Sequence, residues 1–303
     1  MAPTLKNTIK TLALGILLTA SLHSAQAATE PVAHTYVSGA ATTDTYPCSR
    51  TAPCATFQGA LGFTASGGVI TAIDAGDYGP VTITNQSVTI DGSGTQACIV
   101  TNSSTDAFTI MEAVPSDTVI LRHLALTGLS SSNSGVTVIS GNLVVDDCKL
   151  FGFVNGKGLL LRSNGTSMVE NTTISGCSYG IGAFSRGLVS MRNVTLQGNQ
   201  YGLVAAGGPT DIGHSLITQN SIDGLYASSA TLSASGCMIS GNGTGVYADS
   251  GAIIRLTNND ILNNTVGIDT TTGGGTVSTT GDNRKAGNGT PGAPTPGKVI
   301  IQQ

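Results

Sequence analysis

The sequence predicts an all-β protein folded as a parallel β-helix, a solenoid with coils of about 22 residues. Glycine recurs through the middle of the chain in steps of 22, 22, 22, 21 and 22 residues, and a fixed period of this length is typical of a solenoid. Each glycine starts a short, mostly apolar run, and two alternating segments fill the rest of each repeat without a helical stretch between them. The periodic glycines are Gly158, Gly180, Gly202, Gly224, Gly245 and Gly267.

Residues 1–27 have the pattern of an export signal. Lys6 and Lys10 precede an apolar stretch over 11–22, and Ala25 and Ala27 provide the small residues of a cleavage site. The stretch is too short to span a bilayer. We therefore expect cleavage after Ala27 and a secreted, periplasmic or cell-surface protein without a membrane span.

Residues 28–65 form an N-terminal segment before the repeats. Cys48 and Cys54 flank a loop-like stretch, where export permits a disulfide; two free surface thiols are the alternative. Over 56–63, Phe57, Ala60 and Leu61 have helical spacing. This spacing predicts a short amphipathic helix that caps the open N-terminal end of the solenoid.

The β-helix itself is expected over residues 66–281, with its first strands at 67–74 and 81–92. Later coils carry two short alternating strands that meet at a bend, in addition to the glycine-led strand. One apolar position anchors the alignment of these coils: Leu126, Leu150, Ile174, Leu196, Ile217, Ile239 and Ile261. The composition then turns to Gly, Pro and Thr, so we expect residues 282–303 to form a loose tail, with 299–301 as a candidate edge strand.

An asparagine follows the anchor by three residues in four successive coils. Coils stack about 4.8 Å apart, so these amides can hydrogen-bond to one another along the axis and satisfy backbone groups at the turn. A buried structural ladder is the favoured interpretation, and an amide-lined binding site is the alternative. The residues are Asn199, Asn220, Asn242 and Asn264.

Charge is sparse: 10% of residues are charged and the net charge is -4. Without a basic patch, nucleic acid is not an expected partner. The cysteines lack C-x-x-C spacing, so no zinc site is expected. We expect a monomer that requires no cofactor, with polysaccharide or a cell-surface glycan as its candidate partner.

Two stretches resemble a known superfamily. Val88-Thr89-Ile90-Asp91-Gly92, and later segments such as 193–199 (Asn-Val-Thr-Leu-Gln-Gly-Asn), are similar to the repeats of secreted right-handed β-helix proteins of the pectate-lyase-like superfamily. The resemblance covers roughly residues 66–281 and implies a single-stranded right-handed parallel β-helix, the hand that parallel crossovers favour. Its members include polysaccharide lyases, glycoside hydrolases, epimerases, tailspikes and proteins without known activity.

One stripe of the repeat gathers acids, bases and amides at the bend between the two alternating strands. A groove that processes saccharides is one interpretation: acids hold Ca²⁺ against a uronate and a base removes a proton, or paired acids hydrolyse a glycosidic bond. A surface charge ladder is the other. Catalytic candidates are Arg122, Asp146, Asp147, Lys149, Glu170, Arg192 and His214, and metal candidates are Asp146, Asp147 and Glu170.

Specific catalytic motifs do not fit the sequence. Asp146-Asp147, Gly213-His214 and the basic pair Arg284-Lys285 loosely resemble elements of polygalacturonases. However, His214 falls three coils after Asp147, about 14 Å along the axis, whereas the resemblance requires the next coil.

Tyrosines form two expected outer stacks, Tyr179 with Tyr201 and Tyr226 with Tyr247. Such rings can contact the face of a sugar, or they can simply stabilise neighbouring strands. Taken together, the sequence favours an exported, non-catalytic surface, adhesive or carbohydrate-contacting scaffold. A polysaccharide-processing enzyme, such as a uronate lyase or glycoside hydrolase, is the alternative.

Overall fold

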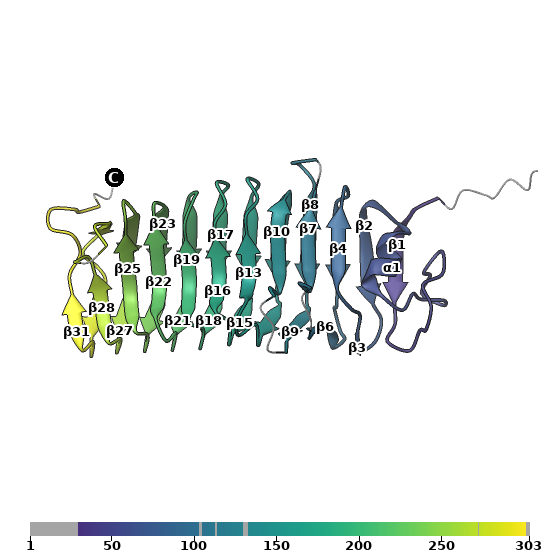
Figure 1. Cartoon of the computed structure of the whole chain (residues 1–303), viewed down its shortest axis with the longest axis horizontal. Coiled ribbons are helices and arrows are strands. Elements are labelled where there is room, and N and C mark those ends of the chain that lie inside the picture. Colours follow the sequence, from purple (N-terminus) through teal and green to yellow (C-terminus); the bar gives the residue numbers. More distant parts are fainter. Residues whose placement is uncertain (1–29, 103–104, 113, 130–132, 272, 301–303) are drawn as a thin grey trace, which may run out of the picture.

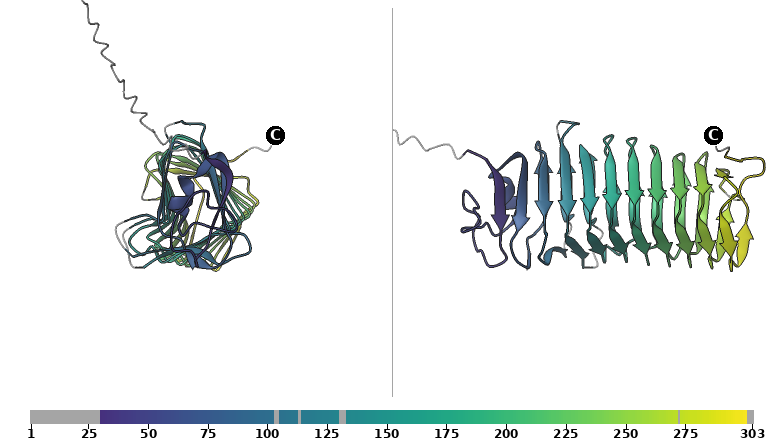
Figure 2. Two further views of the ribbon diagram at one scale, coloured as in Figure 1. Left: turned by 90° about the vertical axis from the view of Figure 1, so that its right-hand side faces the viewer. Right: turned by 180° about the vertical axis from the view of Figure 1, so that it is seen from behind.

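The chain folds into a right-handed parallel β-helix of about ten coils (Figure 1). The computed structural model describes residues 30–102, 105–112, 114–129, 133–271 and 273–300; the predicted export signal, 1–27, lies outside them. Seen along the long axis, the coils overlay as a ring around one core (Figure 2). No helix among the described residues is long and apolar enough to cross a membrane.

Three parallel sheets run along the axis. The first sheet contains, in spatial order, β1 (Val32–Val37), β2 (Thr64–Ala72), β5 (Val88–Asp91), β8 (Thr118–Arg122), β11 (Asn142–Asp146), β14 (Ser167–Glu170), β17 (Val189–Arg192), β20 (Thr210–Gly213), β23 (Thr231–Ser235), β26 (Ile253–Thr257) and β29 (Thr276–Thr279). The second contains β4 (Val81–Thr84), β7 (Phe108–Met111), β10 (Val136–Ser140), β13 (Lys157–Leu161), β16 (Tyr179–Ala183), β19 (Tyr201–Ala205), β22 (Asp223–Ser228), β25 (Thr244–Asp249), β28 (Val266–Asp269) and β31 (Thr290–Gly292). The third contains β3 (Gly76–Asp77), β6 (Ala97–Thr101), β9 (Ala125–Gly128), β12 (Lys149–Phe151), β15 (Thr173–Ser175), β18 (Thr195–Gln197), β21 (Leu216–Thr218), β24 (Met238–Ser240), β27 (Asp260–Leu262) and β30 (Arg284–Ala286).

Each coil visits the first, third and second sheets in turn, as β17, β18 and β19 do. Leu196 aligns with Ile174 on one side and Ile217 on the other, so the predicted anchor positions stack in register. All three side chains are fully buried. Alternation along each short strand thus places one apolar row from every sheet in the core.

The periodic glycines are required by close packing between coils. A Cβ atom on Gly202 would lie 2.5 Å from the carbonyl oxygen of Gly224 and 2.9 Å from Nδ2 of Asn220. Gly224 has the same relation to Gly245 and Asn242. The glycine period and the asparagine period are therefore two sides of one packing contact.

The asparagines form a hydrogen-bonded ladder inside the turn between the third and second sheets. Nδ2 of Asn199 donates to Oδ1 of Asn220 over 3.1 Å, and Nδ2 of Asn220 donates to Oδ1 of Asn242 over 2.9 Å. Asn242 donates in the same way to Asn264 over 2.9 Å. Each oxygen also accepts the backbone N–H of the preceding asparagine, so the ladder satisfies groups that are shut off from water.

The N-terminal end is closed by α1 (Phe57–Leu61), whose Phe57, Ala60 and Leu61 are buried as their spacing predicts. Cys48 and Cys54 form a disulfide. Strand β1, which we did not expect, lies in the same segment and pairs in parallel with β2. Its alternation is masked in the sequence because the buried Thr35 is polar; in the fold, Thr35 is hydrogen-bonded to Thr64 over 2.8 Å.

The coils continue past residue 281, where we expected a loose tail. Strands β30 and β31 pair with β27 and β28. Asn288 extends the ladder, because its Oδ1 accepts from Nδ2 of Asn264 over 3.0 Å. We did not predict this coil because its composition is rich in Gly and Pro, although Asn288 stands at the position of the earlier ladder asparagines. Val299 forms a parallel bridge with Thr279 at the expected final edge.

Candidate functional site

The polar stripe lies at the carboxyl ends of the first-sheet strands. Arg122, Asp146, Glu170 and Arg192 are register neighbours on β8, β11, β14 and β17. Among the described residues, however, no ion pair joins any two of these four. The charges run plus, minus, minus, plus along the axis, and neighbouring opposite charges among these four do not form ion pairs.

The next residue in each coil turns the chain from the first sheet to the third, and its backbone explains why it is polar. Every residue of this bend row has a positive φ, between 47° and 62°. Among non-glycine residues, Asn, Asp and His are the ones that most readily adopt this left-handed conformation. The row is His123, Asp147, Asn171, Asn193, His214, Gly236 and Asn258.

Asp91 is the centre of the charged cluster and was missing from the predicted stripe. Oδ2 of Asp91 lies 2.9 Å from Nη2 of Arg122, and its Oδ1 lies 3.0 Å from Nδ1 of His123. Oδ1 also accepts the backbone N–H of Ser93 over 2.8 Å. Burial alone would raise the pKa of Asp91, but the hydrogen bonds from Ser93 and His123 and the charge of Arg122 hold it below its ordinary value.

The three metal candidates do not come together. Among the described residues no three His, Cys, Asp or Glu side chains are grouped so that they could hold a metal ion, so Asp146, Asp147 and Glu170 do not form the Ca²⁺ site that the lyase alternative would need. The left-handed bend separates the adjacent aspartates. Asp146 accepts a hydrogen bond from Nδ2 of Asn171 over 2.8 Å, whereas Asp147 lies with Oδ2 3.8 Å from Nε2 of His123.

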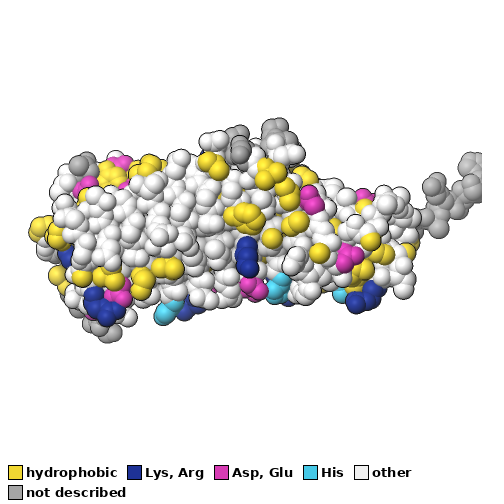
Figure 3. Space-filling model, turned by 90° about the horizontal axis from the view of Figure 1, so that it is seen from below, with side chains coloured by type: hydrophobic (Ala, Val, Ile, Leu, Met, Phe, Trp, Pro, Cys, Tyr) yellow, Lys and Arg dark blue, Asp and Glu magenta, His cyan; other side chains and the backbone are white. Residues whose placement is uncertain are grey.

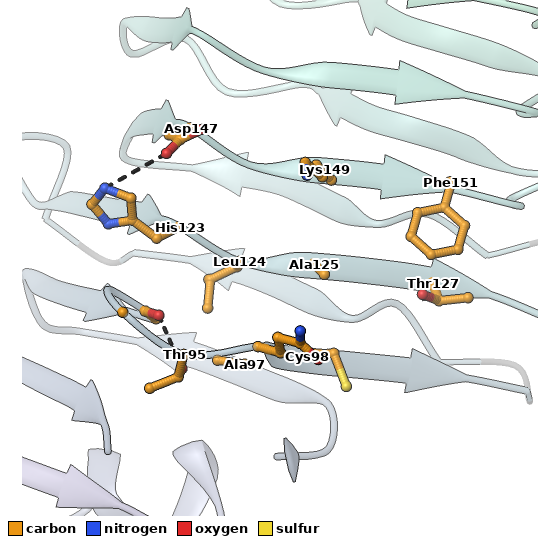
Figure 4. A pocket seen from close by; sticks show the side chains of 13 residues that line it. Thr95, Ala97, Cys98, His123, Leu124, Ala125, Thr127, Asp147, Lys149 and Phe151 are labelled. Carbon is orange, nitrogen blue, oxygen red and sulfur yellow. Dashed lines mark hydrogen bonds and ion pairs between the residues drawn. The ribbon is translucent and has the colours of Figure 1, made fainter. Parts of the chain in front are cut away.

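A surface hollow of about 570 Å³ opens beside this cluster, over β6, β9 and β12 (Figure 4). Of the predicted catalytic candidates, Asp147 and Lys149 line it. Arg122, Asp146, Glu170, Arg192 and His214 do not. On the face formed by the third sheet, histidine and most basic side chains lie along one edge, acidic side chains lie at both edges, and most of the surface between them is uncharged (Figure 3).

The four predicted tyrosines form one continuous row on the outside of the second sheet. Ring centroids are 5.1 Å apart for Tyr179 and Tyr201, 6.1 Å for Tyr201 and Tyr226, and 5.5 Å for Tyr226 and Tyr247. All four rings are half-buried. The contact between Tyr201 and Tyr226 joins what we expected to be two separate stacks.

Two charged groups contact the tyrosine row. The ammonium of Lys157 lies 5.4 Å from the ring centre of Tyr179, the first ring. At the third ring, the hydroxyl of Tyr226 donates to Oδ2 of Asp249 over 2.8 Å. Burial, together with this hydrogen bond, raises the pKa of Tyr226 to about 12, so its hydroxyl remains a donor across the physiological range.

Comparison with protein families gives a match to the right-handed β-helix region over residues 70–212 and 179–292. The chain therefore belongs to the right-handed β-helix family. Comparison with curated proteins gives no match.

Three solved structures illustrate the likeness of fold. The A-module of mannuronan C-5 epimerase AlgE4 from Azotobacter vinelandii matches with a TM-score of 0.52 and 16% identity, covering 78% of this chain and 91% of the module. The A-module of AlgE6 from the same organism matches with 0.53 and 14%, covering 77% and 88%. Pectate lyase Pel9A matches with 0.49 and 17%, covering 81% and 67%. At these identities the likeness shows the fold alone.

Proposed function

We propose that this chain is an exported, non-catalytic scaffold that contacts carbohydrate, and that the tyrosine row is its contact surface. The observation that carries the proposal is the continuity of four half-buried rings over four successive coils. The row is offset between its second and third rings, because Tyr201 is in register with Asp223 and Tyr226 with Val204. It therefore offers a stepped aromatic surface to a ligand that spans the four coils. The names of the two epimerase modules with this fold include mannuronan, and this suggests the class of ligand.

The geometry of the row suits a passive contact. The rings meet edge to face or tilted, at 86°, 73° and 59°, which fixes their positions without covering them. Lys157 adds a cation beside the first ring, and the hydroxyl oxygen of Tyr226, whose proton is donated to Asp249, adds an acceptor. These groups recognise sugar hydroxyl and acidic substituents, and none of them needs to transfer a proton in order to bind.

Binding by Tyr201→Ala tests the proposal, because Tyr201 is in contact with a ring on each side. Polysaccharides are first screened on a glycan array with and without Ca²⁺, and affinity for the selected glycan is then measured by calorimetry. We expect Tyr201→Ala to weaken binding roughly tenfold, equivalent to about 1.4 kcal/mol. Tyr201→Phe should retain most of the affinity, and Thr195→Ala, on the third sheet of the same coil, should retain all of it. Unchanged binding by Tyr201→Ala would overturn the assignment of the surface.

The polysaccharide-processing alternative has less support. Asp146, Glu170 and Arg192 are register neighbours on a sheet, and they do not line the hollow beside Asp91 or the two smaller hollows near residues 256–294 and 207–253. Incubation with uronate polymers and Ca²⁺, followed by absorbance of an unsaturated product, tests this alternative directly. Turnover that is lost in Asp146→Ala or Arg192→Ala would replace the passive proposal.

A further inference from the structure

The hollow over β6, β9 and β12 exists because three features depart from the repeat. The first is the connection from the first to the third sheet. Two residues make this bend between β8 and β9 and again between β11 and β12, but 92–96 provide five residues between β5 and β6. The longer loop is held by hydrogen bonds from the backbone N–H and the hydroxyl of Thr95 to the carbonyl oxygen of Gly92. It forms one wall of the hollow.

The second feature is the small side chain of Ala125. It occupies an outward row of the third sheet in which every other residue is larger, so the surface dips at this coil. In register order the row is Cys98, Ala125, Lys149, Thr173, Thr195, Leu216, Met238 and Asp260.

The third feature is the opposite wall, where Lys149 and Phe151 project from β12 (Figure 4). The Phe151 side chain is 43% exposed, unusually high for a large aromatic residue. Within the described residues Lys149 forms no ion pair, so its ammonium is available at the rim. An apolar ring and a cation therefore stand side by side above a small apolar floor.

Polar groups close the end of the hollow nearest the bend. Nδ1 of His123 is oriented by Asp91 at 3.0 Å, and Nε2 lies 3.8 Å from Oδ2 of Asp147. The carboxylate of Asp91 and the hydroxyl of Ser93, which lies 2.8 Å from Nδ1, hold the ring in place, while Nε2 lies on the side of Asp147. The buried Asp91 is thus a positioning residue for a histidine that lines the hollow.

We propose that this hollow binds a small organic anion built on a ring. The ring lies over Ala125 and against Phe151, the anionic group pairs with Lys149, and a hydroxyl of the ligand forms a hydrogen bond with His123. Two kinds of compound combine a ring with an anionic group in this way: a sugar acid and an aromatic acid. The site lies on the third sheet, away from the tyrosine row on the second, so the proposal does not depend on carbohydrate contact by the tyrosines.

Calorimetric titration with glucuronate and with 4-hydroxybenzoate tests the proposal and separates the two kinds of compound. We expect the wild-type protein to bind one of these probes. Ala125→Met fills the hollow with a side chain that the same row already carries at Met238, and should abolish binding. Thr195→Met, at the equivalent position three coils away, is the matched control and should bind normally.

Two further variants separate charge from shape. Lys149→Met should weaken binding roughly fivefold through loss of the ion pair, and Lys149→Arg should restore it. Tyr201→Ala should leave binding of the probe unchanged, which distinguishes failure of this site from failure of the carbohydrate surface. Binding of neither probe at millimolar concentration, or equal binding by Ala125→Met and the wild type, would overturn the proposal.

Discussion

The polar row at the bend is a case where the backbone selects the residue type. His123, Asp147, Asn171, Asn193 and His214 share a left-handed conformation that strains most side chains, and this is sufficient to explain their identities. The residue types of this row, which suggested catalysis in the sequence, are therefore explained in part by the left-handed φ angles of the bend. What distinguishes His123 from the rest of the row is its partner, Asp91; it shares the hollow with Asp147.

Asp91 could not be found by the repeat alignment. The strand β5 ends at Asp91 and pairs it with Arg122, as the stripe requires. The intervening residues, however, make this coil longer than the later ones, so a search at 22-residue spacing passes over it. The signal that could have revealed it is the Asp-Gly that follows an alternating strand at 88–91.

Titration of Asp223 should be visible in the stability of the protein. Burial raises the pKa of Asp223 to about 6, partly offset by a hydrogen bond from Thr244 and reinforced by the charge of Asp269. Because the pKa in the folded state lies above the ordinary value, the protonated carboxyl favours folding; its contribution is complete below about pH 4 and is lost as the pH rises through 6.

We therefore predict that Asp223→Asn melts roughly 2–4 °C above the wild type at pH 8 and at the same temperature at pH 3.5, as measured by calorimetry. Asp211→Asn, an exposed position on the first sheet, serves as the control and should change little at either pH. A gain in Tm that is the same at both pH values would contradict this account of Asp223.

At the scale of elements, the coupling between glycine and asparagine determines the turn into the second sheet. The sequence showed both periods, and each was interpreted correctly as scaffold. It did not show that Gly202 must lack a side chain because Nδ2 of Asn220 occupies that space. Such a contact joins neighbouring coils, so it appears only when the register between them is known.

Replacing an asparagine inside the ladder should be costly. Asn220 accepts the backbone N–H and the Nδ2 group of Asn199, and donates to the carbonyl of Leu196 and to Asn242. Asn220→Ala removes these four bonds and strands buried donors, so we predict a loss of about 2–4 kcal/mol in the free energy of unfolding, measured with urea.

Asn288→Ala is the matched comparison, because Asn288 makes three of the four contacts at the half-exposed end of the ladder: it accepts twice from Asn264 and donates to the carbonyl of Ile261. Water can replace its hydrogen bonds, so its loss should be less than half that of Asn220→Ala. Equal losses in the free energy of unfolding would show that burial does not determine how much each asparagine of the ladder stabilises the fold.

At the scale of the whole molecule, periodicity was enough to predict the architecture, while the local spacing of apolar residues predicted the capping helix and the expected export predicted the disulfide. It was not enough to predict the ends or the hollow, because these depend on departures from the repeat. The additional strand β1, the extra coil with β30 and β31, and the loop 92–96 all lie where the period is broken or its composition changes. In a solenoid the regular part specifies the fold, and binding sites are to be sought in the irregular part.

The same nearest-neighbour construction predicts how damage at one end spreads. Phe57 is fully buried at the N-terminal end, where its ring centre lies 4.8 Å from that of Tyr78. Phe57→Ala should cost about 3–5 kcal/mol locally and expose the core beneath α1. Because each coil contacts only its neighbours, the loss should decline with distance along the axis.

Hydrogen exchange followed by mass spectrometry should therefore show faster exchange in β1, β2 and β5, and wild-type protection in β23 and β26. Disulfide-intact protein in both samples keeps the Cys48–Cys54 loop constant. A uniform loss of protection from β1 to β26 would mean that the solenoid unfolds as one cooperative unit, contrary to this prediction.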